Sequence, residues 1–207
     1  MKKFLLINLV ILNLYTISVL AQQQDSTIWI INNRNVQFGN EIYLNSKPGS
    51  GFVFIKDSDF SNGVIELDLK GKNEKGRSFI GIAFHGQNDS TYEAVYFRPF
   101  NFLNHEKVTH SIQYIYHPKF KWYNLRNDFP QKYESNIHPI PNPDDWFHIK
   151  LLVEYPIIKV FINHSENSSF EIEELSPFSN GWIGLWVGNN SDGYFRNLKI
   201  TPCKQKP

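Results

Sequence analysis

The sequence contains a single cysteine, Cys203, among its 207 residues, so no disulfide can form within the chain. Its stability must therefore come from a packed hydrophobic core. The sequence also lacks an excess of charge, since 21 Lys and Arg residues are balanced by 20 Asp and Glu residues. Proteins that bind nucleic acid usually show a strong basic excess, so this balance argues against a nucleic-acid partner.

Sustained helical periodicity is also lacking. After residue 22 no hydrophobic pattern of helical period continues over three turns; short alternating stretches rich in Ile, Val, Phe and Tyr recur between Gly, Asn, Ser and Pro. This rhythm predicts an all-β sandwich or barrel. The predicted strands are Ile28–Ile31, Glu41–Leu44, Gly51–Ile55, Gly63–Lys70, Phe79–His85, Tyr92–Arg98, His110–Tyr116, Phe147–Glu154, Ile157–Ile162, Phe170–Glu173, Trp182–Val187 and Tyr194–Ile200. The proline-rich and aromatic segment 117–145 breaks the rhythm and is predicted to be a long irregular loop.

The N-terminus has the pattern of a secretory leader. Lys2 and Lys3 precede an apolar run, Phe4–Leu20, that is too short and too often interrupted by polar residues for a membrane span. We predict a signal peptide at 1–21 and a single domain at 22–207. The mature protein is then secreted or periplasmic, with no membrane span after cleavage.

Three predicted strands, Phe79–His85, Tyr92–Arg98 and Trp182–Val187, each carry one aliphatic face. Their opposite faces alternate small residues with rings and polar groups. If these strands are neighbours, we expect a trough with a floor of small residues and walls of aromatic rings and one guanidinium, a shape that suits a sugar. The residues of this face are Gly81, Ala83, His85, Tyr92, Ala94, Tyr96, Arg98, Trp182, Gly184 and Trp186.

Three stretches carry a family resemblance: GWIGLWVGNNSDGYFRNLKI at 181–200, FSNGVIELDLKG at 60–71 and FIGIAFHG at 79–86. The first resembles the last strands of the concanavalin A-like lectin/glucanase superfamily, which includes laminin G-like modules. The other two resemble secreted jelly rolls grouped with 3-keto-disaccharide hydrolases. Over roughly 28–201 the resemblance implies a two-sheet antiparallel jelly-roll sandwich with an oligo- or polysaccharide bound on its concave sheet.

The sequence departs from the enzymes of that superfamily at one motif. Retaining glucanases carry Glu-x-Asp-x-Glu on one strand, and here the similar string Glu66-Leu67-Asp68-Leu69-Lys70 ends in lysine. Retaining hydrolysis needs two carboxyl groups about 5 Å apart. The glucanase motif is therefore incomplete, and a solvated outer strand face is the alternative role of Glu66 and Asp68.

Arg98 is the first candidate ligand contact, because Pro99 fixes it at a strand end on the trough face. Its five donors suit sugar hydroxyls or a sugar carboxylate. The alternative is a salt bridge to an acid such as Glu93 or Glu134 that holds the long loop down.

Further candidate contacts offer rings or an amide to a sugar: Tyr96, Trp122 and Trp186 by ring surface, and Gln113 by its side-chain amide. The alternative for each tryptophan is ordinary packing. The face of Gln113 is ambiguous because Ile112 and Ile115 point to opposite sides of their strand. Tyr114 is the alternative trough residue.

If the protein is an enzyme, a glycoside or keto-glycoside hydrolase, its catalytic candidates are Glu134, Glu93 and His85, with Glu134 first. Surface or loop-bracing use is the alternative for Glu134. A third hypothesis is a non-catalytic structural or adhesion module, whose trough would be filled by its own side chains. No cofactor is predicted except calcium at a rim loop, near Asp59 or 189–192.

Overall fold

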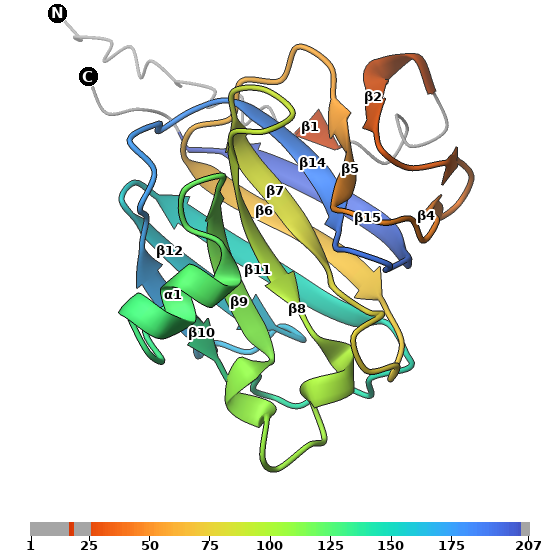
Figure 1. Cartoon of the computed structure of the whole chain (residues 1–207). Helices are drawn as coiled ribbons and strands as arrows, with labels where there is room; N and C mark the ends of the chain where they lie inside the picture. Colours follow the sequence, from red (N-terminus) through yellow and green to blue (C-terminus); the bar gives the residue numbers. More distant parts are fainter. Residues whose placement is uncertain (1–16, 19–25, 204–207) are drawn as a thin grey trace, which may run out of the picture.

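The computed structural model describes residues 17–18 and 26–203, which form two stacked antiparallel sheets (Figure 1). Sheet A has the order β13 (Phe170–Glu173), β12 (Ile157–Ile162), β11 (Phe147–Glu154), β6 (Gly63–Lys70), β15 (Gly193–Pro202), β4 (Ile42–Leu44) and β3 (Val36–Gln37), with β1 (Ile17–Ser18) also paired to β15. Sheet B has the order β10 (Glu134–Ser135), β9 (Ile112–His117), β8 (Tyr92–Phe97), β7 (Ile80–Gly86), β14 (Trp182–Val187), β5 (Gly51–Ile55) and β2 (Trp29–Asn32). The predicted all-β, two-sheet antiparallel sandwich is confirmed.

The helices are short. The only α-helix among the described residues is α1 (Trp122–Asp128), and 3-10 turns span Ser26–Ile28, Pro99–Asn101 and Val108–His110. The segment predicted to be irregular therefore contains α1, whose two turns are too short for a hydrophobic period to reveal. Within the described part of the chain, no helix is long and apolar enough to cross a membrane. Apart from β1, the predicted signal peptide lies outside the described residues.

Sheet A shows the alternation that the sequence predicts. Ile65, Leu67 and Leu69 of β6 point to the core and are fully buried, whereas the residues between them are partly exposed. Glu66 and Asp68 lie on the outer face, where Asp68 contacts His148 and Arg196. The predicted solvated face is correct, but β6 lies in the middle of the sheet rather than near its edge.

Sheet B shows no such alternation, since every residue of β7, β8 and β14 is buried. The inner face of sheet B carries Ile82, Val95 and Leu185, which point across the core toward sheet A. Residues on the other face are buried as well, so the outer face of sheet B must be largely covered.

The strand register shows what lies on that outer face. One row of directly paired residues crosses five strands: Phe52, Trp186, Gly81, Tyr96 and Gln113. Directly paired residues of antiparallel strands point to the same side of the sheet. Gln113 therefore lies on the outer face, and the ambiguity left by the sequence is resolved because Tyr114 points into the core.

The predicted floor of small residues is wrong. A Cβ atom added to Gly81 would lie 2.1 Å from the carbonyl oxygen of Val95, so this glycine is required by the close approach of the next strand. Ala83 and Ala94 are fully buried. The rings of neighbouring residues on the same face, rather than these small residues, form the accessible floor.

Candidate functional site

Two adjoining cavities form a groove on the outer face of sheet B. The larger has a volume of about 470 Å³ and the smaller about 190 Å³, and Phe79 and Trp122 line both. Tyr96, Ile115 and Trp186 lie at the base of the smaller cavity, while Arg98, His110 and Arg126 line the larger one. We call the two cavities together the groove.

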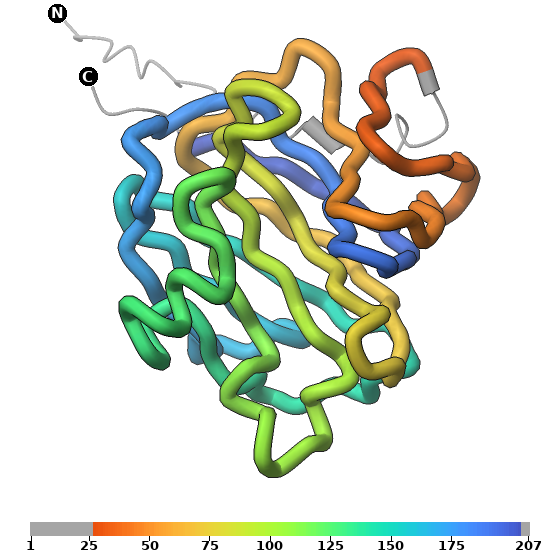
Figure 2. Tube along the Cα trace, viewed as in Figure 1, coloured from red at the N-terminus to blue at the C-terminus, as the bar shows by residue number. Residues whose placement is uncertain are grey.

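The surrounding segments show how the chain builds the groove. In Figure 1, α1 lies in front of β9 on the outer side of sheet B, and these two elements are in contact. Figure 2 shows the gold turn after β6 and the lime segment after β8 side by side at one end of the sheet. Lys75 in that turn and Lys107 in that segment both line the larger cavity.

Arg98 is held at the end of β8 by neutral oxygen atoms. Its guanidinium donates to the carbonyl of His110 at 2.7 Å, to the Tyr96 hydroxyl at 2.8 Å and to Gln113 Oε1 at 3.0 Å. Gln113 does not line the groove; its amide donates to the Tyr133 carbonyl and fixes Arg98 from behind. The alternative of a salt bridge from Arg98 to Glu93 or Glu134 is not what the structure shows.

Aromatic rings supply the apolar surface of the groove. Trp122 on α1 is 45 % exposed and Tyr123 is 51 % exposed, with their ring centroids 5.8 Å apart. Buried Leu125 anchors α1 to the sheet, so the exposed rings stand on a fixed helix. Trp186 and Tyr96 are nearly buried and pack with centroids 5.0 Å apart, so they offer little ring surface to the smaller cavity.

Glu134 lies behind the wall of the groove and does not line it. Its carboxylate receives a bidentate contact from Arg126, with Nη2 at 2.5 Å from Oε2, and lies 2.8 Å from Nδ1 of His110, outside hydrogen-bond geometry. The side chain of Glu134 is only 3 % exposed. These contacts are those of the loop-bracing alternative, because they join α1 to β10.

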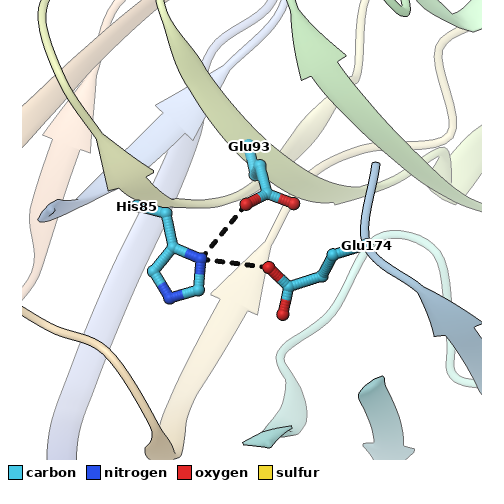
Figure 3. Close-up of side chains that lie close together, drawn as sticks. All are labelled: His85, Glu93 and Glu174. Carbon is cyan, nitrogen blue, oxygen red and sulfur yellow. Dashed lines mark hydrogen bonds and ion pairs between the residues drawn. The ribbon is translucent and has the colours of Figure 1, made fainter. Parts of the chain in front are cut away.

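His85 and Glu93 lie between the two sheets, away from the groove (Figure 3). Nδ1 of His85 is 3.1 Å from a carboxylate oxygen of Glu93 and 3.1 Å from one of Glu174, and all three side chains are fully buried. Nε2 of His85 contacts the Ser61 carbonyl at 2.7 Å. The hydroxyl of Tyr114 completes this core cluster by donating to Glu93.

A β-bulge explains why the predicted trough position of His85 is wrong. Phe84 and His85 together stand opposite Ile183, and His85 has a φ of 49°. This extra residue turns the imidazole from the outer face to the inside. Glu93 lies two residues before Val95 on β8 and therefore points inward as Val95 does. Glu174 follows the last residue of β13 and continues the alternation of buried and exposed residues in that strand, so its side chain is buried. The sequence reasoning missed Glu174.

The sequence matches the family described as 3-keto-alpha-glucoside-1,2-lyase-like domain over residues 19–201. The chain belongs to this family. None of the curated proteins compared with this lyase-like domain matches its sequence.

Several solved structures share the two-sheet jelly-roll fold of this chain. Carbohydrate-binding module CBM66 from Bacillus subtilis is 17 % identical, with a TM-score of 0.58 over 83 % of this chain and 93 % of that chain. A protein of unknown function with a galectin-like fold from Bacillus subtilis is 12 % identical, with a TM-score of 0.60 over 89 % of this chain and 94 % of that chain. The lumenal domain of VIP36 bound to Ca²⁺ and Man3GlcNAc is 13 % identical, with a TM-score of 0.59 over 87 % and 86 %. At these identities the likeness shows the fold.

Burial and hydrogen bonding set the charges of the core cluster in this lyase-like domain. Burial alone would lower the pKa of His85, but its contacts with Glu174 and Glu93 outweigh burial and raise that pKa to about 9. Burial, with the charge of Glu174 acting in the same direction, raises the pKa of Glu93 to about 7. A protonated His85 therefore lies between two carboxyl groups, one of which keeps its proton in mildly acidic solution.

We expect the lyase-like domain to lose stability as the pH rises from about 5 to about 9. The folded state keeps the Glu93 proton up to about pH 7 and the His85 proton up to about pH 9, whereas the unfolded chain loses them near about 4.5 and 6.5. Because the folded state binds more protons in this range, the free energy of unfolding falls with pH, by on the order of a few kcal/mol. Glu93→Gln cannot ionise and should flatten the fall between about pH 5 and 7.

Urea unfolding at a series of pH values measures this effect, with exposed Glu171→Gln as the matched control. An unchanged pH slope in Glu93→Gln would show that Glu93 does not titrate as described.

The core cluster could also hold a metal ion in the lyase-like domain. Its ligand atoms lie within 4.8 Å of one another, and an imidazole nitrogen with two carboxylates is a donor set that Zn²⁺ accepts. The rim oxygens considered for calcium have protein partners instead: Asp59 accepts from Asn180, Asn189 accepts from Gly49, and Asp192 pairs with Lys72. Calcium binding at these loops stays a prediction.

Proposed function

We propose that this protein binds a saccharide in the groove on the outer face of sheet B. The groove offers ring surface at Trp122 and a fixed guanidinium at Arg98, and sugars present both apolar faces and hydroxyl edges. Two fold neighbours are sugar-binding by name, since CBM66 is a carbohydrate-binding module and the VIP36 domain was solved with Man3GlcNAc. These likenesses support a carbohydrate ligand and leave its identity to experiment.

The exposure of Trp122 is the observation that carries this proposal. A large ring on a short helix normally packs inward, and the buried neighbour Leu125 already anchors α1. Trp122 instead keeps 45 % of its surface exposed at the junction of the two cavities. A sugar ring stacked there would span both cavities.

Trp122→Ala should weaken saccharide binding about tenfold or more, because a stacked tryptophan is a typical hot spot. Isothermal titration against the best ligand from a glycan array measures the loss. Tyr155→Ala removes an equally exposed ring outside the groove and should bind like the wild type. Equal saccharide affinity in Trp122→Ala and Tyr155→Ala would exclude the groove as the binding site.

A second candidate function, cleavage of a glycoside or keto-glycoside, is favoured by the family to which the chain belongs. The histidines that line the cavities are His110 and His117, and no described Asp or Glu lines either cavity. Glu134 reaches the groove only through Arg126 and His110. Turnover of a 3-keto-disaccharide, followed by mass spectrometry, tests this candidate function. Unchanged product release in both His110→Asn and Glu134→Gln would exclude these two groups as catalytic residues.

We also place the protein outside the cytoplasm, secreted or periplasmic. The basic start and short apolar run of residues 1–21 support export. The mass of the chain recovered from its host tests this, since a mature protein should begin at Gln22.

A further inference from the structure

The groove has an uneven charge. Its lining includes the cationic side chains of Lys75, Arg98, Lys107, Lys121 and Arg126, which come from four separate segments of the chain. Among the residues that the structure describes, no Asp or Glu lines either cavity. The whole chain carries a formal charge of only +1, so the groove gathers positive charge that the rest of the surface balances.

Most of these cations have no acidic partner. Arg126 is paired with Glu134, but the ion pairs found in residues 26–203 include none to Lys75, Lys107 or Lys121. The net charge along the groove is therefore positive. A positively charged cleft raises the local concentration of anionic ligands.

Arg98 supplies the buried positive charge of the groove. It is only 5 % exposed, and its hydrogen bonds go to two neutral side chains and a carbonyl oxygen. Burial, with the charge of Arg126 acting in the same direction, lowers the pKa of Arg98. A desolvated guanidinium without a carboxylate partner is unfavourable on its own, and an anion in the adjoining cavity would offset that cost.

The geometry also leaves Arg98 donors for a ligand. The three hydrogen bonds occupy both Nη2 protons and one of the two Nη1 protons, so Nε–H and one Nη1–H remain of the five donors. Nη2 belongs to both two-donor edges of a guanidinium, so the two remaining donors lie on different edges, and each can donate singly to an oxygen of a carboxylate or sulfate.

We infer that the groove takes an acidic saccharide, with the anionic substituent at Arg98 in the larger cavity and a sugar ring against Trp122. This inference rests on the proposed function and adds the ligand class. The exposed amines of Lys75 and Lys107 at the rim of the larger cavity extend the positive field toward solvent.

Titration with a galacturonate trisaccharide and with its fully methyl-esterified counterpart tests the inference, because esterification removes the charges and adds only one methyl group to each carboxyl group. We expect the acidic probe to bind at least about tenfold more tightly, and to lose affinity between about 50 and 500 mM NaCl. A sulfated disaccharide provides a second arm, which tells sulfate recognition from carboxylate recognition.

The double variant Lys75→Gln/Lys107→Gln should weaken binding of the acidic probe severalfold more than it weakens binding of a neutral saccharide. Lys56→Gln/Lys199→Gln makes the same change in net charge at exposed lysines outside the groove, and it should bind like the wild type.

Equal binding of ester and acid, or tight binding of neutral sugars alone, would overturn the acidic ligand and leave saccharide binding standing. No binding by any acidic or neutral member of a broad saccharide panel would overturn both.

Discussion

His85→Ala is expected to lower the free energy of unfolding at about pH 7.5 by about 3–5 kcal/mol. The substitution removes the imidazolium that lies 3.1 Å from a carboxylate oxygen of Glu93 and 3.1 Å from one of Glu174, and both carboxyl groups are fully buried. Without it, two buried carboxyl groups face each other inside the core with no cation to balance them. Chemical denaturation of the wild type and the variant measures the loss.

The pH dependence separates this electrostatic loss from a simple packing loss. The raised pKa of His85 contributes stability that is fully present below about pH 6.5 and is lost as the pH rises through about 9, so the deficit of His85→Ala should be largest near about pH 6 and shrink above about pH 9, whereas a cavity would cost the same at every pH. Leu67→Ala, which removes a fully buried side chain of β6 outside the core cluster, is the packing control and should show a deficit that does not depend on pH. A pH-independent deficit in His85→Ala would contradict the charges assigned to the core cluster.

Arg98→Gln is expected to lower the affinity for an acidic saccharide about a hundredfold or more. The loss is large because the charge is buried at the ligand cavity and its planar donors cannot be replaced by a neutral amide. Arg98→Lys keeps the charge but loses the hydrogen bonds that hold the planar guanidinium in place, and its affinity should fall between those of the wild type and Arg98→Gln. Titration with the galacturonate trisaccharide measures both variants.

Because Arg98 is also bonded to Tyr96 and Gln113, its variants need a check on folding. Gln113→Ala provides it, since this residue contacts Arg98 but does not line the groove. If Gln113→Ala and Arg98→Gln were equally stable and lost equal affinity, Arg98 would act through local order rather than by direct contact. Full binding by a folded Arg98→Gln would contradict its role altogether.

The fold could be predicted because local pattern and tertiary burial agree in most strands. The alternation of Ile65, Leu67 and Leu69 with polar residues appears in the structure as a core face and a solvent face. The family resemblance adds the jelly-roll topology, which strand patterns alone do not specify. The helix α1 was missed because two turns carry too little periodicity to stand out among prolines and aromatic residues.

The candidate site was predicted in part. Tyr96, Arg98 and Trp186 line one groove, as the alternation within strands led us to expect. Trp122, from the segment predicted to be an irregular loop, lines it too, and the role of all four as ligand contacts stays a prediction. Gln113 lies on the expected face but beneath Arg98. The basis of the expectation was partly wrong, because Gly81 serves close strand pairing rather than an open floor.

The catalytic candidates show what local pattern cannot reveal. His85 alternates correctly with Gly81 and Ala83 in sequence, and only the bulge opposite Ile183 sends it into the core. A positive φ at a histidine leaves no mark in a single sequence. Glu174 was overlooked because an acid just beyond a strand reads as a loop residue until its buried partners are known.

The five tryptophans permit one direct test of the central claim, that the groove is the ligand site. Indole N–H signals in a nitrogen–proton NMR spectrum, assigned by single Trp→Phe variants, can be followed while the galacturonate trisaccharide is added. The account predicts a saturating shift of the Trp122 signal, with a smaller one for Trp186, and no shift for Trp146, whose ring packs against Arg196 on sheet A. A saturating shift of Trp146 with Trp122 unchanged would place the ligand elsewhere and contradict it.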